Sequence, residues 1–219
     1  MILDRFINLR FTSIDKKSYS QSHFSRHLVV LFVLDVMLVV FASPVKRSAN
    51  ICHLTVYTIR QLEIMSSNLD HDMREAGRIQ SANGINGLET IRDHLPFLRS
   101  DITSANEALW ITRFSNICKT LKAAFHRVRE QEGEISRLSE MTSFQYPVSN
   151  IQKKLQSLTS RIRIWMQFKQ ISDTRLDTEV TYTTPCDVTC MSQRNLYVVN
   201  LLKTFVYASL EQEERLCSL

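Results

Sequence analysis

Glycine and proline are scarce in this chain of 219 residues, which contains four of each. A β-sandwich or β-barrel needs a turn about every 8–12 residues, and such turns depend heavily on these two residue types. Their scarcity therefore argues against an all-β fold. The chain is rich instead in Leu, Ile, Arg, Lys, Glu and Gln, which favour long helices joined by few connections. We expect an all-α protein whose length suits one ordinary domain.

The sequence also lacks the common catalytic signatures. It contains no His-Glu-x-x-His, no glycine-rich phosphate loop and no Gly-x-Ser-x-Gly. Beyond residue 43 its histidines are scattered singly, at His53, His71, His94 and His126. We therefore expect no enzymatic activity, no cofactor and no metal site.

The net charge of the chain is only mildly positive. The formal net charge is +5, and no block of five like charges occurs. Nucleic-acid-binding domains usually carry a stronger and more clustered positive charge. We therefore expect no nucleic-acid partner.

One long apolar run, Leu28–Ala42, lies near the N-terminus and is interrupted only by Asp35. Basic residues precede it, and Val40-Phe41-Ala42 supplies the small –1 residue and an acceptable –3 residue of a cleavage site, as in a secretory signal sequence. The alternative is a type II membrane anchor, but a permanent span needs roughly 20 apolar residues. Asp35 would also cost such a span about 2.5–3.5 kcal/mol. We predict a signal sequence over 1–42 and a secreted mature domain over 43–219.

Apolar side chains recur at intervals of three and four residues in four segments of the mature part, which is the spacing of one helix face. They predict helices over about 52–80, 105–132, 148–171 and 188–214. We expect these side chains to form the core: Leu54, Thr58, Leu62, Met65, Leu69, Met73 and Ala76; Trp110, Phe114, Ile117, Leu121, Phe125 and Val128; Val148, Ile151, Leu155, Leu158, Ile162 and Trp165; and Leu196, Val199, Leu202, Phe205, Val206 and Leu210.

The ends of the expected helices carry local signals. Ser104 and Glu107 have the spacing of a capping box, in which each side chain accepts a hydrogen bond from a free backbone amide. Pro147 suits the first turn of the third helix. Glu213 and Glu214 lie unfavourably at the C-terminal end of the fourth helix, where the helix dipole is negative, so we expect that end to fray.

The connections between the expected helices are long, shorter and long. Most bundles join antiparallel neighbours through about 2–8 residues. A link of 15 extended residues spans roughly 50 Å and can return the chain along a whole bundle. This pattern predicts a long-chain four-helix bundle of up-up-down-down topology with two long crossover connections.

The five cysteines are Cys52, Cys118, Cys186, Cys190 and Cys217. In a secreted protein they are disulfide candidates before they are metal ligands, although Cys186 and Cys190 also have a spacing open to zinc. In the expected bundle the start of the first helix and the end of the fourth share one end. Cys52 could therefore pair with Cys217 or with the last connection, whereas Cys118 on the inner side of its helix is expected to be a buried thiol.

Three stretches carry a resemblance to a known family. They are Cys52-His53-Leu54; the run from Phe114 to Leu121 continuing through Phe125-His126-Arg127-Val128; and Arg194–Val199 with Leu201–Phe205. With a signal sequence and four long helices, they resemble the interleukin-6 family of helical cytokines, which includes leukaemia inhibitory factor, oncostatin M, ciliary neurotrophic factor and related fish factors. The resemblance implies a secreted, monomeric ligand without a membrane span in its mature form.

The same resemblance implies where partners bind. The family contacts its shared signal-transducing receptor chain through the first and third helices, so it points to Arg60, Glu63, Ser67, Arg74, Lys153, Gln156, Arg163 and Gln167 as receptor-binding residues. Members that use the leukaemia inhibitory factor receptor have a Phe-x-x-Lys pair at the start of the last helix. Here that region reads Cys186-Asp187-Val188-Thr189-Cys190-Met191, without the pair.

The function expected from the sequence is therefore that of a cytokine that cross-links cell-surface receptor chains. Two other functions fit the same pattern. One is another four-helix hormone, similar to growth hormone, prolactin or granulocyte colony-stimulating factor. The other is a type II membrane-anchored helical interaction protein that retains Leu28–Ala42.

Overall fold

A computed structural model describes residues 44–82, 84–173, 180–182 and 186–217. The elements follow in the order α2 (Pro44–Glu75), β1 (Ile85–Asn86), α3 (Glu89–Leu98), α4 (Glu107–Leu138), α5 (Gln145–Phe168), β2 (Thr181–Tyr182), α6 (Val188–Leu210) and α7 (Glu213–Leu216). The predicted signal sequence and the rival membrane anchor lie outside these ranges. Among the helices within them, none has the length and hydropathy that a membrane span requires.

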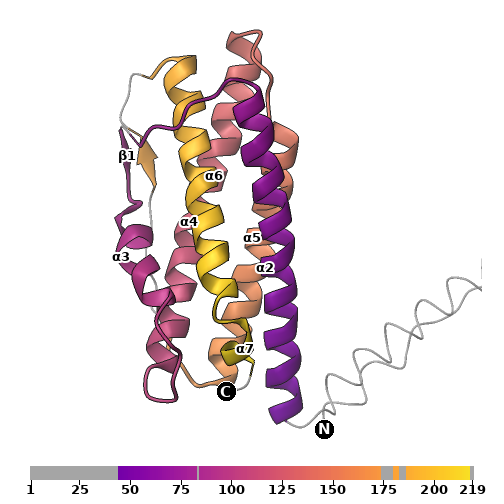
Figure 1. The fold of residues 1–219 in the computed structure, drawn as a ribbon, viewed down its shortest axis with the longest axis vertical. Helices are drawn as coiled ribbons and strands as arrows, with labels where there is room; N and C mark the ends of the chain where they lie inside the picture. Colours follow the sequence, from indigo (N-terminus) through magenta and orange to yellow (C-terminus); the bar gives the residue numbers. More distant parts are fainter. Residues whose placement is uncertain (1–43, 83, 174–179, 183–185, 218–219) are drawn as a thin grey trace, which may run out of the picture. The chain divides into compact units, whose positions relative to one another are not determined.

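Four long helices dominate the domain, as the composition predicts (Figure 1). Helix α2 packs against α5 and α6, and helix α4 packs against the same two helices. Their inner faces enclose one apolar core. The prediction of an all-α protein is confirmed.

The apolar stripes predicted for α4 and α5 are buried throughout, from Trp110 to Val128 and from Val148 to Trp165. In α6 the predicted stripe is buried except for Leu210, which is half-buried. These stripes form the core because one face of each helix is apolar and the other is polar. Within the core, the Phe114 ring lies 5.0 Å from that of Trp110 and 5.2 Å from that of Phe205, centroid to centroid.

The register predicted for α2 is partly wrong. Leu54 is 49% exposed and Ala76 is also exposed, whereas Cys52, Val56 and Ile59 are buried. The helix has apolar residues on both of its flanks, so two stripes compete within the same 3.6-residue period. Packing against α5 and α6 buries Leu62, Leu69 and Met73 of the predicted stripe and replaces its first residue, Leu54, by the residues of the neighbouring stripe.

Helix bounds also differ from the prediction. Helix α2 starts at Pro44 and ends at Glu75, and Gly77 follows with a positive φ of 77°. Helix α4 continues through Gly133 to Leu138. A Cβ at Gly133 would lie 3.3 Å from Nε2 of Gln145, so glycine here leaves room for the start of α5.

The capping box predicted at the start of α4 is absent. The N-cap is Asn106, and its side chain makes no capping hydrogen bond. Its Oδ1 instead accepts a hydrogen bond from the amide of Thr103 at 2.8 Å. The carboxylate of Glu107 forms an ion pair with Lys169, with Oε1 and Nζ 2.8 Å apart. A contact with the end of α5 has replaced the local cap.

The first connection contains structure that the sequence analysis did not predict. Helix α3 buries Ile91 and Leu98 against α4, and the indole nitrogen of Trp110 donates a hydrogen bond to the carbonyl of Leu98 at 3.3 Å. Strand β1, which precedes α3, pairs antiparallel with β2 of the last connection, with Ile85 opposite Tyr182. The two long connections therefore meet on one side of the bundle (Figure 1).

Helix α6 has a conventional start and an early end. The carboxylate of Asp187 accepts a hydrogen bond from the amide of Cys190 at 2.7 Å and caps the helix. The helix ends at Leu210, before the predicted 214, and the short helix α7 follows. Glu213 belongs to α7, where its carboxylate forms an ion pair with Arg60.

Candidate functional site

The seam between α2 and α5 is the first candidate for a binding surface. Nζ of Lys154 donates a hydrogen bond to Oε1 of Gln61 at 2.7 Å. About two turns further along α5, the guanidinium of Arg161 donates to the carbonyl of Leu54 and to the hydroxyl of Thr58. These contacts fix which flank of each helix borders the seam.

Large apolar side chains are exposed along this seam. Tyr57 and Ile64 of α2 are 59% and 62% exposed. They lie on the flank of Gln61, which is four residues after Tyr57 and three residues before Ile64. Ile164 and Phe168 of α5 are also exposed, at positions three and seven residues after Arg161. With Leu54, these side chains form what we call the α2–α5 face.

Exposed apolar side chains gathered on one face are typical of interaction sites, because soluble proteins rarely leave contiguous apolar patches in water. The α2–α5 face combines two aromatic residues, Tyr57 and Phe168, with the cations of Lys154 and Arg161 at its centre. Aromatic residues and arginine are the side chains most often found at energetic hot spots of interfaces. The face therefore suits a protein partner.

Helix α5 is strongly asymmetric in charge. Its sequence contains Lys153, Lys154, Arg161 and Arg163 but no aspartate or glutamate. In the described part of the chain, none of these four cations forms an ion pair. Lys154 and Arg161 bond instead to neutral groups of α2. A partner of this helix should carry negative charge.

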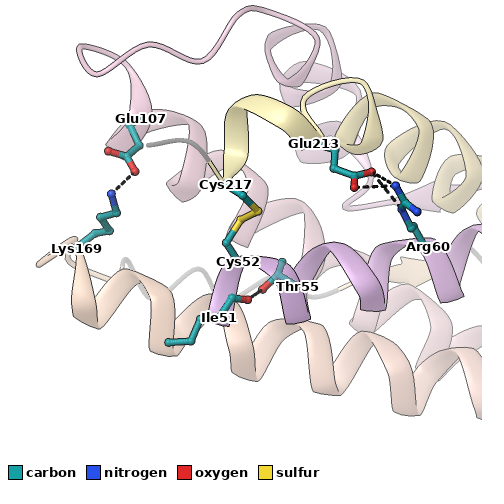
Figure 2. The surroundings of a disulfide bond; sticks show 8 residues. All are labelled: Ile51, Cys52, Thr55, Arg60, Glu107, Lys169, Glu213 and Cys217. Atoms are coloured by element: carbon teal, nitrogen blue, oxygen red, sulfur yellow. Dashed lines mark hydrogen bonds and ion pairs between the residues drawn. A yellow bond between two sulfur atoms is a disulfide. The ribbon is translucent and has the colours of Figure 1, made fainter. Parts of the chain in front are cut away.

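The structure places the receptor-binding residues predicted on α2 beside α6 and α7. The guanidinium of Arg60 forms two parallel hydrogen bonds to the carboxylate of Glu213, at 3.1 and 2.7 Å, which raise the pKa of Arg60 (Figure 2). Nε of Arg74 donates to Asp70 at 3.0 Å, and Asp70 also accepts from Lys203 of α6 at 2.6 Å.

Glu63 and Ser67 lie three and seven residues after Arg60 and are half-buried on that flank. The predicted residues of α5 lie elsewhere. Gln156 follows Gln152 by four residues, and Nε2 of Gln152 lies 3.4 Å from Nδ1 of His126 on α4. Arg163 occupies the same flank two turns later.

Lys153 and Gln167 are exposed beside the flank of Gln156 and Arg163. The structure therefore does not bring the two predicted sets together. The set on α2 borders α6, and the set on α5 points outward and toward α4. The physical reason is that a helical period places residues relative to their own helix axis, whereas the neighbouring helix is chosen by packing.

The sequence patterns do not predict the residues that share the α2–α5 face. They place Leu54 in the core and assign no role to Tyr57, Ile64, Ile164 and Phe168. A signal was present, because these apolar residues do not fall on the buried stripes. In α5 the stripe runs through Leu158, Ile162 and Trp165, which leaves Ile164 without a place in the core.

Two disulfides close the domain. Cys52, in the N-terminal part of α2, bonds to Cys217, which follows α7 (Figure 2). The two cysteines are 165 residues apart in the sequence. Cys186 and Cys190 bond to each other across the first turn of α6. This second bond consumes both sulfurs that had a spacing open to zinc, so that alternative is wrong. Across the described ranges, no other cluster of His, Cys, Asp or Glu has a metal-binding arrangement.

Cys118 is a free thiol inside the core and is fully buried. Burial raises the pKa of this thiol well above its ordinary value, because the thiolate would lose its hydration. A nucleophilic cysteine needs the opposite conditions, namely exposure and a lowered pKa. Cys118 is therefore a core residue and not a reactive site.

Comparison of the chain with protein-family models, with curated proteins and with solved structures finds no match.

Proposed function

We propose that this protein is a secreted helical cytokine that cross-links cell-surface receptor chains, similar to the interleukin-6 family. The observation that carries the proposal is the exposed α2–α5 face on a disulfide-closed bundle of long helices. A rigid bundle of this kind offers separated helix faces to different partners. We propose that the α2–α5 face binds the shared signal-transducing receptor chain.

An up-up-down-down topology of the long-chain type is part of this proposal. It is supported by contacts at both ends of the bundle. Arg78 follows α2 and bonds to Glu132 near the end of α4, so these two helices end at the same place. Cys52 in α2 bonds to Cys217, which follows α6 and α7. The start of α2 and the end of α6 are therefore neighbours.

Secretion is supported by the disulfides, which persist in oxidising compartments and are rare in the cytosol. Four of the five cysteines are joined in two bonds. The corresponding test is mass spectrometry of the protein recovered from the medium of animal cells. A mature N-terminus near Ser43 or Ser48 is expected, whereas retention of Leu28–Ala42 would favour the membrane-anchored alternative.

Receptor binding can be tested by surface plasmon resonance with the ectodomain of the shared receptor chain of the interleukin-6 family. The test variant is Tyr57→Asp with Ile164→Asp, which places two carboxylates on the α2–α5 face. We expect a loss of affinity of at least about 100-fold, because central aromatic and aliphatic anchors dominate interfaces.

The matched control is Tyr207→Asp with Leu109→Asp. It changes the same kind of residues at exposed positions, 46% and 47%, on α6 and α4. Unaltered binding by the control and loss by the test variant would support the proposed surface. Absence of binding by the oxidised wild-type protein would overturn the proposal of an interleukin-6-like function. A response from a growth-hormone, prolactin or granulocyte colony-stimulating-factor receptor would favour the second four-helix class.

A further inference from the structure

A second, chemically different groove runs between α4 and α5. The exposed side chains of His126 and Gln152 meet across it, with Nδ1 and Nε2 3.4 Å apart. At one end of it lies a depression of about 360 Å³ lined by Arg129, Gln145, Tyr146 and Ser149. All four lining residues are polar at their tips, so this groove differs from the apolar α2–α5 face.

Cations line this groove at regular intervals. Lys122 and Arg129 lie four residues before and three residues after His126, so they share its flank of α4. Arg163 lies eleven residues after Gln152, on the flank of α5 that faces α4. No ion pair involves Lys122, Arg129 or Arg163 within the ranges that the structure describes. The neighbouring carboxylate of Glu130 pairs with Arg127 at 2.9 Å and with Nε2 of His126 at 3.3 Å.

The helix directions set the spacing of these charges. Gln145 lies beside Gly133 and Gln152 lies beside His126, so α4 and α5 run in opposite directions. At a rise of about 1.5 Å per residue, Arg129, Lys122 and Arg163 then follow one another at intervals of roughly 10 Å along the groove. A single phosphate or sulfate ion is too small to reach all three, whereas an extended polyanion matches the row.

Hydrogen-bonding side chains fill the intervals between the cations. They come from α5 and are Gln145, Ser149, Gln152 and Gln156, all on the flank of the groove. Amides and hydroxyls of this kind bind sugar hydroxyls and sulfate oxygens. The groove thus presents alternating charge and neutral polar groups, which is the pattern of a sulfated sugar chain.

We propose that the α4–α5 groove binds a sulfated polysaccharide of the cell surface or matrix. The choice of this polyanion rests on the proposed secretion, because it is the abundant extracellular polymer of that charge. The groove lies on the flank of α5 opposite the seam with α2. Polysaccharide and receptor chain are therefore expected to bind the same molecule together.

The first experiment is chromatography on immobilised heparin, combined with surface plasmon resonance on a heparin oligosaccharide. The test variant is Lys122→Gln with Arg129→Gln, and the control is Arg92→Gln with Arg99→Gln, which removes the same charge from exposed positions in and after α3. At about 0.15 M salt we expect about a tenfold loss of affinity for the test variant and less than about twofold for the control. Arg163→Gln alone should lower the affinity about threefold.

Equal loss in the test variant and the control would show that only net charge matters and would overturn the proposed groove. Undiminished binding to fully desulfated heparin would overturn the sulfate requirement. Tighter binding to single-stranded DNA than to heparin would overturn the polysaccharide in favour of a nucleic acid.

A second measurement avoids substitutions altogether. The wild-type protein is acetylated with and without heparin and then analysed by mass spectrometry. Heparin should protect Lys122 but not Lys203, which pairs with Asp70 of α2. Equal labelling of Lys122 in both samples would contradict the proposal. The receptor experiment separates the two proposals, because the Lys122→Gln/Arg129→Gln variant should bind the receptor chain with wild-type affinity. Heparin binding without receptor binding would overturn the receptor proposal alone.

Discussion

Arg78 and Glu132 form an ion pair in which both side chains are completely buried. Arg78 also donates a hydrogen bond to the carbonyl of Thr142 at 2.8 Å, and Glu132 accepts one from the amide of Phe144 at 2.8 Å. Asn195 of α6 adds a third donor to Glu132 at 2.7 Å. One carboxylate thus ties together the first connection, α4, the loop before α5, and α6.

Removing one partner of this pair should be severely destabilising. Arg78→Met leaves an uncompensated buried carboxylate at Glu132, so we expect the free energy of unfolding to fall by about 3–5 kcal/mol. Chemical denaturation followed by circular dichroism measures the change. The control is Arg60→Met, which breaks the solvent-exposed pair with Glu213 and should change the stability little, because exposed ion pairs are screened by water. Similar losses in both variants would contradict the distinction drawn from burial.

The bond between Cys52 and Cys217 should contribute more to stability than the bond between Cys186 and Cys190. It closes a loop with a separation of 165 residues, against only 4 for the other. In the chain-entropy model a longer loop restrains the unfolded state more strongly. Replacing both residues of the long-range pair by serine should lower the free energy of unfolding by about 2–5 kcal/mol.

The paired substitution Cys186→Ser with Cys190→Ser is the comparison for the same denaturation experiment. Its expected loss is smaller, because Asp187 still caps the first turn of α6 after the sulfurs are removed. A larger loss for this pair than for Cys52 and Cys217 would refute the loop-length argument.

Cys118 should be unreactive in the folded protein. Its thiol is buried and its pKa is raised by burial, so both access and ionisation are suppressed. A thiol titration with Ellman's reagent at pH 8 should detect no group in native buffer. In denaturant without a reducing agent it should detect one. Rapid labelling of Cys118 under native conditions would contradict its placement in the core.

Stability should decline as the pH is lowered through the ordinary range of histidine, in part because of His94. Burial and the nearby positive charge of Arg113 lower the pKa of His94 below 6.5, and Asp93 opposes this only weakly. The unfolded chain therefore takes up a proton at a higher pH than the folded one. The contribution of neutral His94 is complete above pH 6.5 and is lost as the pH falls from 6.5 to the folded pKa.

An NMR titration of the His94 ring measures this pKa directly. The variant Arg113→Gln should raise it, because the repelling charge is removed, and His94→Gln should flatten the acid limb of the stability curve. A measured pKa at or above 6.5 in the wild-type protein would contradict the assigned cause.

Much of the helical architecture could be predicted from local patterns. The inward stripes from Trp110 to Val128 and from Val148 to Trp165 are complete, because their apolar residues keep the three- and four-residue spacing of one helix face without interruption. Helix α2 shows the limit of that reasoning, since Leu54 competes with Val56 for the core. The pair of Arg78 and Glu132 was also beyond local patterns, because nothing in either residue's neighbourhood marks it as buried.

The candidate surfaces show the same division. The absence of acidic residues in α5 is visible in the sequence, and it underlies both proposed partners. The pairing of Gln61 with Lys154, and the grouping of Arg129 with Gln145, appear only when the helices are packed. Arg60 and Arg74 were predicted as receptor-binding residues, and only the packed structure shows that they lie beside α7 and α6.

The sequence by itself determined that the chain beyond residue 43 forms long amphipathic helices, which side chains of α4 and α5 face the core, and that Cys118 lies inside. Only the tertiary structure decided which cysteines pair, which helix flanks meet, and that α3 forms within the first connection. The physical reason is that a 3.6-residue period sets the angle of a side chain about its own helix axis. The identity of the neighbour across each flank depends on long-range packing, to which residues far apart in the sequence contribute together.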